Sequence, residues 1–172
     1  PIQFTRELLP TLLARDEAHI LNVCSVGGLF ARGKLAAYHV SKFGLVGFSS
    51  SLRAEYVARG LGVTALCPGY VRTNLFRAAL SGRPSRPVRM PPRWLTTSPE
   101  RLATHAIKAI RRNQGLAVVT PMGRGLWYLQ RLSPRLVEWL GGLGRKGKKA
   151  GNRFQTVGAA SAAPEHALGI RH

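Results

Sequence analysis

The chain has 172 residues, of which 45% are hydrophobic, and a formal net charge of +19. This length supports one globular core, and no apolar run is long enough to cross a membrane. The two cysteines, Cys24 and Cys67, lack the spacing of a metal site and form no dense disulfide framework. We therefore expect a reducing, cytoplasmic setting.

The positive charge is concentrated in the second half of the chain. Residues 1–75 hold eight Lys/Arg against four Asp/Glu, whereas residues 76–172 hold eighteen against three. A basic half suggests nucleic acid, an anionic membrane surface or acidic substrates as partners. However, the excess is mostly scattered arginine, with no nucleic-acid motif and no aromatic stacking platform. We expect a solvated, arginine-rich surface and no nucleic-acid partner.

The first part of the chain alternates between helical and strand-like segments. Residues 3–15 carry leucines at helical spacing, and residues 18–25 form a short apolar run typical of a buried strand. A long helix is predicted over 35–59, ended by glycines, and a second strand over 62–67. This order predicts an α/β fold with a parallel sheet and crossover helices. Cys24 and Cys67 would then end neighbouring strands, as buried, reduced thiols close to each other.

The second part begins with an irregular segment. Residues 76–97 are rich in proline and arginine and are expected to be an irregular substrate loop, which acts as a lid or binding loop or is disordered. Ser98 followed by Pro99 predicts the start of a helix, and residues 116–120 predict an edge strand. Residues 125–141 predict one or two short helices, divided at Ser133-Pro134.

Three polar side chains are placed together by this predicted topology. Ser25 ends the strand over 18–25, and Tyr38 and Lys42 lie one helical turn apart in the stretch AAYHVSK. Pro68-Gly69 follows the next strand. Ligands of open parallel sheets bind beyond the carboxyl ends of the strands. The sequence therefore predicts a site at this edge of the sheet.

The residue types at this edge suit proton transfer to or from an oxygen atom. A neighbouring lysine ammonium favours the ionised form of a tyrosine. Tyr38 could then donate a proton to a carbonyl or accept one from an alcohol, and Ser25 could hydrogen-bond the same oxygen. A hydride donor opposite them would complete the reduction of a ketone.

The stretches NVCSVGG, YHVSK and PGYVRTNL occur in the order and spacing of a known family. The chain resembles the short-chain dehydrogenase/reductase family, in the branch with a Tyr-x-x-x-Lys active site. The resemblance is specific from about residue 3 to residue 75 and looser to about residue 140. It implies the carboxyl-terminal part of a doubly wound Rossmann-type parallel sheet with flanking helices, and NAD or NADP as cofactor.

The resemblance also implies a role for individual residues. Tyr38 would be the catalytic acid/base and Ser25 the residue that orients the substrate. Lys42 would bind the nicotinamide ribose hydroxyls and promote ionisation of the tyrosine. The nicotinamide would be lined by the residues after the second strand, with the Val71 main chain and the Thr73 hydroxyl near its carboxamide: Pro68, Gly69, Val71 and Thr73.

The chain departs from the family pattern at the glycine-rich turn T-G-x-x-x-G-x-G, which holds the cofactor pyrophosphate and is absent here. The stretch N-N-A-G is also absent, and the chain begins at Pro1. We therefore expect a fragment of a longer enzyme, inactive alone. Its predicted parts are an incomplete Rossmann-type catalytic region over 1–122, carboxyl-terminal helices over 123–143, and a basic, disordered tail over 144–172.

Two alternatives to an oxidoreductase of secondary alcohols and ketones stay open. One is a family-derived binding protein that has lost catalysis. The other is attachment to an anionic membrane through residues 127–140 and the basic residues after them. We expect a small, hydrophobic alcohol or ketone as substrate, and a homo-oligomer formed through the helices over 3–15 and 35–59. His39 and His105 are given no role, and no metal constellation is predicted.

Overall fold

The computed structural model describes residues 1–33, 35–73 and 91–143. Its main sheet contains the strands β1 (Ala18–Val23), β2 (Leu61–Cys67) and β5 (Leu116–Val118). All neighbours pair in parallel, in the order β1-β2-β5. The predicted α/β fold with a parallel sheet is confirmed, and the strand expected over 116–120 does lie at an edge of the described sheet.

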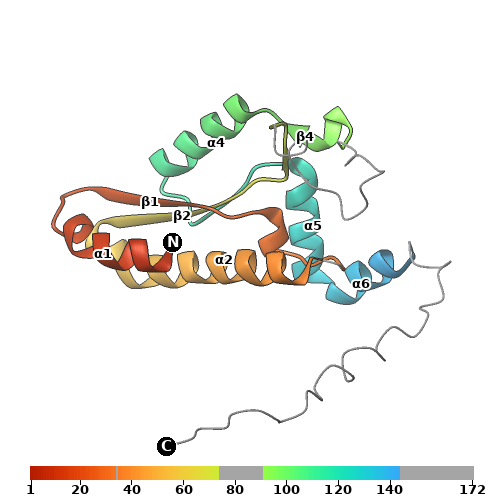
Figure 1. Cartoon of the computed structure of the whole chain (residues 1–172), viewed down its shortest axis with the longest axis horizontal. Coiled ribbons are helices and arrows are strands. Elements are labelled where there is room, and N and C mark those ends of the chain that lie inside the picture. Colours follow the sequence, from red (N-terminus) through yellow and green to blue (C-terminus); the bar gives the residue numbers. More distant parts are fainter. Residues whose placement is uncertain (34, 74–90, 144–172) are drawn as a thin grey trace, which may run out of the picture.

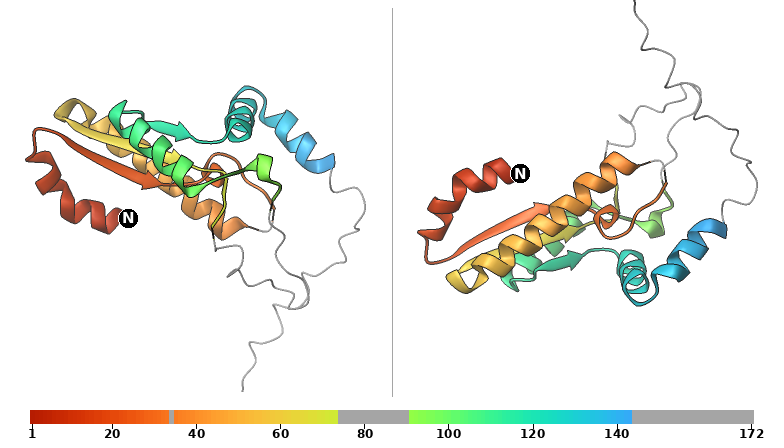
Figure 2. Two further views of the ribbon diagram at one scale, coloured as in Figure 1. Left: turned by 90° about the horizontal axis from the view of Figure 1, so that it is seen from above. Right: turned by 90° about the horizontal axis from the view of Figure 1, so that it is seen from below.

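Helices pack on both faces of this sheet. Figure 1 shows α1 (Ile2–Leu13) and α2 (Ala36–Tyr56) on one side and α4 (Pro99–Arg111) on the other. Figure 2 shows the same layers from above and below, with α4 in front of the strands in one view and α2 in the other. The short helices α5 (Pro121–Leu132) and α6 (Pro134–Leu143) follow β5, divided at Ser133 as predicted.

The central strand β2 is buried over its whole length, which explains its apolar run. Its alternate residues Leu61, Val63, Ala65 and Cys67 belong to the core clusters that partly buried residues of α2 complete. The opposite face of β2 carries Gly62, Thr64 and Leu66, which are also buried. There the Thr64 hydroxyl donates to the Gln114 carbonyl at 2.6 Å and lies 2.8 Å from His19 Nε2.

The helix ends follow their local sequence signals. The Ser98 hydroxyl accepts from the Arg101 N–H at 3.3 Å at the start of α4. In the same way Thr120 accepts from the Gly123 N–H at the start of α5. A short 3-10 helix extends α2 and ends at Gly60, whose φ of 84° suits a residue without a Cβ atom. These ends confirm the predicted helix boundaries to within a few residues.

The two cysteines confirm the predicted strand order. Val23 pairs with Leu66, so Cys24 and Cys67 are the next residues along two neighbouring strands. Both thiols are buried and free. A hydrogen bond to Cys24, together with burial, raises the pKa of the Cys67 thiol. Cys67 is therefore the thiol of the pair that keeps its proton, whereas the hydrogen bond from Cys67 lowers the pKa of Cys24.

The segment expected to be wholly irregular, 76–97, ends in regular structure. Thr96–Thr97 forms the strand β4, which pairs in parallel with β3 (Tyr70–Val71) in a separate two-stranded sheet. The sequence did not predict this pairing because each strand has only two residues. The rest of the predicted substrate loop, over 76–90, and the tail over 144–172 lie outside the described residues. The division into parts at 122 and 143 stays a prediction.

Candidate active site

Ser25 lies immediately beyond the carboxyl end of β1, where the chain turns into a short 3-10 helix over Val26–Gly28. Its extended backbone places it at the start of that helix, and its side-chain oxygen accepts from the Gly27 N–H at 3.0 Å. The residue is buried. Since the hydroxyl oxygen serves as acceptor in this bond, its hydrogen is left to donate to another group.

Tyr38 and Lys42 lie one turn apart near the start of α2, as predicted. The Lys42 ammonium donates to the Val23 carbonyl at 3.2 Å, which holds it at the carboxyl end of β1. Tyr38 is 43% exposed. Within residues 1–33, 35–73 and 91–143 its hydroxyl makes no hydrogen bond. The phenol is thus available to a ligand.

The backbone of Gly27 brings the serine and the tyrosine together. A Cβ atom on Gly27 would lie 2.8 Å from Cε1 of Tyr38 and 3.4 Å from Oγ of Ser25. Gly27 therefore contacts both side chains at once, although they are thirteen positions apart in the sequence. Any larger residue at this position would push the tyrosine ring away.

The next glycine sets the distance between this loop and α2. A Cβ atom on Gly28 would lie 2.5 Å from the main-chain oxygen of Lys42. Backbone therefore packs directly on backbone at the turn of α2 that carries the lysine. A further bond, from the Val26 N–H to the Pro68 carbonyl at 2.9 Å, joins the loop to the end of β2.

The four residues predicted to line a nicotinamide lie along the chain that leaves β2. Pro68 is buried, and Gly69 packs against Thr120 so closely that a Cβ atom would lie 2.9 Å from the threonine oxygen. Val71 is half-buried in β3, and Thr73 is exposed. The structure thus brings every predicted site residue to the carboxyl edge of the sheet. Their roles toward a ligand stay predictions.

His39 is a residue whose place sequence analysis missed. Its imidazole is only 7% exposed, with Nδ1 2.7 Å from the Gly27 carbonyl and Nε2 3.0 Å from the Arg32 backbone N–H. Its ring also meets the Tyr38 ring edge-on, with centroids 5.7 Å apart. No local pattern marks this role, because both partners belong to a loop that returns onto α2. His105, in contrast, is exposed on α4 as expected.

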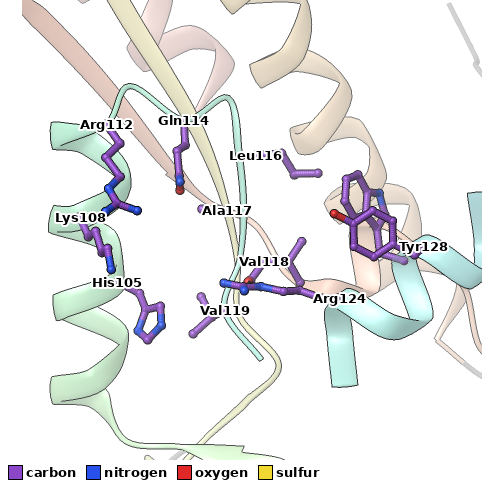
Figure 3. Close-up of a pocket in the computed structure, with 11 residues that line it drawn as sticks. His105, Lys108, Arg112, Gln114, Leu116, Ala117, Val118, Val119, Arg124 and Tyr128 are labelled. Atoms are coloured by element: carbon purple, nitrogen blue, oxygen red, sulfur yellow. Dashed lines mark hydrogen bonds between the residues drawn. The ribbon is translucent and has the colours of Figure 1, made fainter. Parts of the chain in front are cut away.

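A separate cavity of about 380 Å³ lies between α4, β5 and α5. Figure 3 shows Lys108 on α4 and Arg112, directly after α4, pointing into it, with Arg124 pointing toward them from α5. The Arg124 guanidinium is held by the Val118 carbonyl, to which Nε donates at 2.8 Å. Neither Ser25, Tyr38 nor Lys42 lines this basic cavity, so it is distinct from the predicted site.

Among the residues that the structure describes, no three His, Cys, Asp or Glu side chains gather in a group that could hold a metal ion. The predicted site residues at the sheet edge contribute a serine hydroxyl, a phenol and an ammonium.

Comparison with known proteins identifies the family of the chain. A sequence model of the short chain dehydrogenase family matches residues 1–83, which include every predicted site residue. Dehydrogenase/reductase SDR family protein 7-like of Drosophila melanogaster is 33% identical over 141 residues, 81% of this chain and 43% of that protein. Retinol dehydrogenase 10 of Homo sapiens is 36% identical over 120 residues, 68% of this chain and 33% of that protein. The chain belongs to the short-chain dehydrogenase/reductase family.

Solved structures of this family share the fold. A short chain dehydrogenase from Burkholderia cenocepacia in complex with NADP superimposes with a TM-score of 0.67 at 16% identity, over 81% of this chain and 53% of that one. The 3-ketoacyl-(acyl-carrier-protein) reductase from Brucella melitensis, complexed with NADH, has a TM-score of 0.55 at 28% identity, over 68% of this chain and 50% of that one. The predicted Rossmann-type fold is thereby confirmed.

The chain spans less than half the length of the curated relatives named above. The family model covers β1, α2 and β2, which carry the serine, the tyrosine and the lysine, but not α4, β5 or α5. The family model therefore matches the elements that build the predicted site, and the similarity to the relatives extends beyond them.

Proposed function

We propose that the protein containing this chain is an NAD(P)-dependent oxidoreductase that interconverts a secondary alcohol and a ketone. The observation that carries the proposal is the packing of Ser25 and Tyr38 on one glycine, Gly27, beside the Lys42 ammonium at the end of β1. These are the groups that a carbonyl reduction needs for proton transfer and for orienting the reacting oxygen.

The side chains at this edge fit the reactive end of a nicotinamide dinucleotide. An ammonium carries three donors, and Lys42 gives one to the Val23 carbonyl. The others can bind the ribose hydroxyls of NAD or NADP, the cofactors of the family structures described above. The residues that would line the nicotinamide follow β2: Pro68, Gly69, Val71 and Thr73. When bound, this cofactor supplies or accepts the hydride.

Each predicted site residue then has a defined role in the reaction. The Tyr38 hydroxyl gives a proton to the substrate oxygen in the direction of reduction and takes one in the direction of oxidation. The Ser25 hydroxyl accepts from the Gly27 N–H and points its own hydrogen at that same oxygen. Gly27 and Gly28 keep the serine loop close to α2, so that both hydroxyls reach one atom. We infer a small, hydrophobic alcohol or ketone as substrate.

The test is Tyr38→Phe in the complete product of the gene. NADH and NADPH oxidation is followed with cyclohexanone and acetophenone, and reduction of NAD and NADP with the corresponding secondary alcohols, cyclohexanol and 1-phenylethanol. Because general acid catalysis contributes about 10²- to 10⁴-fold, turnover should fall by at least that range. Tyr56→Phe, at the far end of α2, is the matched control and should keep normal turnover. Near-normal turnover in Tyr38→Phe would contradict the assignment.

A second candidate function is favoured by the surface of α5 and α6. Leu132 is 83% exposed and Trp139 is 60% exposed, on helices that also carry Arg131 and Arg135. Within the described residues no helix combines the length and apolar character needed to cross a bilayer. An apolar face beside cations instead suits the interface of an anionic membrane.

Flotation of the chain with vesicles tests this attachment. We expect binding to vesicles that contain phosphatidylserine, and loss of binding in the double variant Leu132→Asp, Trp139→Asp. Ile107→Asp changes an apolar residue on α4 that is 52% exposed and should leave binding intact. Equal flotation of wild type and the double variant would rule out α5 and α6 as the contact.

A further inference from the structure

The loop between the serine and the tyrosine is bound to α2 through the His39 ring. Nε2 lies 3.0 Å from the Arg32 backbone N–H, which can only donate. Nε2 must therefore accept, so the hydrogen of the neutral ring is on Nδ1. From there it is donated to the Gly27 carbonyl at 2.7 Å. One imidazole, in one tautomer, satisfies both main-chain groups.

Burial makes these two hydrogen bonds costly to lose. His39 is among the buried polar residues of the chain, and its ring bonds the main chain of the loop at both ring nitrogens. Removing the His39 ring would leave the Gly27 carbonyl and the Arg32 N–H without these hydrogen-bond partners. A buried group without a partner costs about 1–3 kcal/mol. The loop would relieve this cost by moving toward solvent.

Such a movement would act directly on the predicted catalytic pair. Gly27, whose carbonyl accepts from His39, also donates its N–H to Ser25 and lies against the Tyr38 ring. The ring of His39 meets that of Tyr38 edge-on. His39 directly follows Tyr38 on α2. The same turn of the helix therefore carries both the tyrosine and the ring that binds Gly27.

The other end of the loop is fixed by the same ring. Arg32, whose backbone N–H is bound by His39, extends its guanidinium to 3.4 Å from the Tyr70 hydroxyl in β3. The chain that would line the nicotinamide is thereby connected to the serine loop. Displacing the loop would therefore disturb both the serine and the residues predicted to line the nicotinamide.

We propose that His39 is a positioning residue of the active site. It holds Gly27, and through it Ser25, at the distance from Tyr38 at which both hydroxyls reach the same substrate oxygen. The proposal rests on the proposed function for its catalytic consequence. The loop attachment itself is a property of the chain and can be measured without any activity.

The first measurement needs no substrate and no variant. Correlation of ring protons and nitrogens by NMR in the 172-residue chain distinguishes the two neutral tautomers. We expect His39 to carry its proton on Nδ1. A proton on Nε2 would overturn the proposal, because the Arg32 N–H would then have no acceptor.

The second measurement compares amide hydrogen exchange in three variants. His39→Phe keeps a ring but removes both bonds, and His39→Asn keeps a donor near the position of Nδ1. Both should speed exchange at the Arg32 amide by about tenfold or more, the factor that corresponds to 1.4 kcal/mol of lost protection. His105→Phe, on the exposed surface of α4, should change nothing there. Unchanged exchange in a folded His39→Phe or His39→Asn chain would overturn the attachment.

The third measurement is turnover in the complete gene product. Misplacement by about 1 Å can cost about 10²-fold, so kcat of His39→Phe should fall by about that factor while KM for the cofactor stays within about twofold. His39→Asn should recover part of kcat because the bond to Gly27 returns, although Arg32 stays unbound. Normal kcat in His39→Phe would overturn the positioning role. If the wild type shows no turnover, the proposed function fails, and the tautomer and exchange measurements alone decide whether His39 holds the loop.

Discussion

At the scale of single residues, the site depends on small groups that approach each other closely. Gly27 and Gly28 have no side chain because the tyrosine ring and the backbone of α2 occupy the space that a Cβ atom would need. Lys42 is held by a carbonyl at the end of β1, at the same edge as Ser25. At each of these positions the residue type is therefore explained by a contact with another element of the fold.

His19 leads to a pH-dependent prediction at this scale. Burial, then the nearby Arg53, lowers the pKa of His19 in the folded chain, and its ring donates to Thr64. The unfolded chain therefore binds the proton more tightly, and folding stability should fall as pH drops through the ordinary histidine value of about 6.5. Above that value His19 contributes no pH dependence.

Urea unfolding at a series of pH values between about 7.5 and 5 checks this expectation. His19→Gln keeps a donor for Thr64 but cannot take up a proton, so the stability of this variant should vary less with pH. His105→Gln replaces an exposed histidine and should follow the wild type. An identical pH profile for His19→Gln and the wild type would refute the role of His19.

At the scale of elements, the active-site geometry results from a loop packed on a helix. The 3-10 helix over Val26–Gly28 touches α2 at Lys42 and is joined to the end of β2 by the bond from Val26 to Pro68. The loop therefore has fixed contacts with the two elements that carry the other predicted site residues. Together with the bonds of the His39 ring, these backbone contacts set its position, and they cannot adjust as a flexible side chain can.

Gly28→Ala tests this contact. The new methyl group would meet the main-chain oxygen of Lys42 at 2.5 Å, so the loop or the helix must move. We expect a loss of about 1–3 kcal/mol in the free energy of unfolding, the usual cost of overpacking. Gly125→Ala is the control, because nothing lies within 4 Å of that position in α5 and alanine favours a helix by about 1 kcal/mol. Equal stability of Gly28→Ala and the wild type would show that the loop is not tightly packed.

At the scale of the whole molecule, apolar surface remains uncovered on α1 and α2. Phe4 is exposed on α1, and Val40 is 73% exposed on α2. Phe43, Gly44 and Gly47 follow at helical spacing on α2, and no atom lies within 4 Å of a Cβ built on either glycine. Small residues on an exposed apolar face allow another helix to approach closely. This surface agrees with the expected homo-oligomer, which stays a proposal.

Light scattering of the complete gene product at micromolar concentration checks the oligomer. We expect at least a dimer, converted to monomer by Val40→Glu, because the charge would be buried without a partner. Met122→Glu changes an exposed apolar residue on α5 and should leave the assembly intact. A monodisperse wild-type monomer would contradict the proposal.

A second prediction at this scale concerns the 172 residues alone. The sequence contains no T-G-x-x-x-G-x-G turn, and β1 forms an edge of the described sheet. A glycine turn leading into a helix N-terminus is the main anchor for a dinucleotide pyrophosphate. We therefore expect no appreciable binding of NADH or NADPH to this chain, as followed by nicotinamide fluorescence. Saturable micromolar binding would show that the chain holds the cofactor without that turn.

The sequence by itself determined the order of helices and strands, the caps at Ser98 and Gly60, and the edge at which Ser25, Tyr38 and Lys42 meet. These features depend on local signals: side-chain periodicity, a residue that caps a helix, and the shared edge of parallel strands. They could be predicted because each signal lies within a few neighbouring residues, or follows from topology alone.

Only the tertiary structure decided how the loop lies on α2. It placed Gly27 between the serine and the tyrosine, joined His39 to that glycine and to Arg32, and paired Thr96–Thr97 with Tyr70–Val71. It also formed the basic cavity from three separate elements. These contacts join residues whose separation in the sequence carries no periodic signal. Such contacts form only when the folded chain brings the hydrogen-bonding groups of distant residues within about 3 Å of each other.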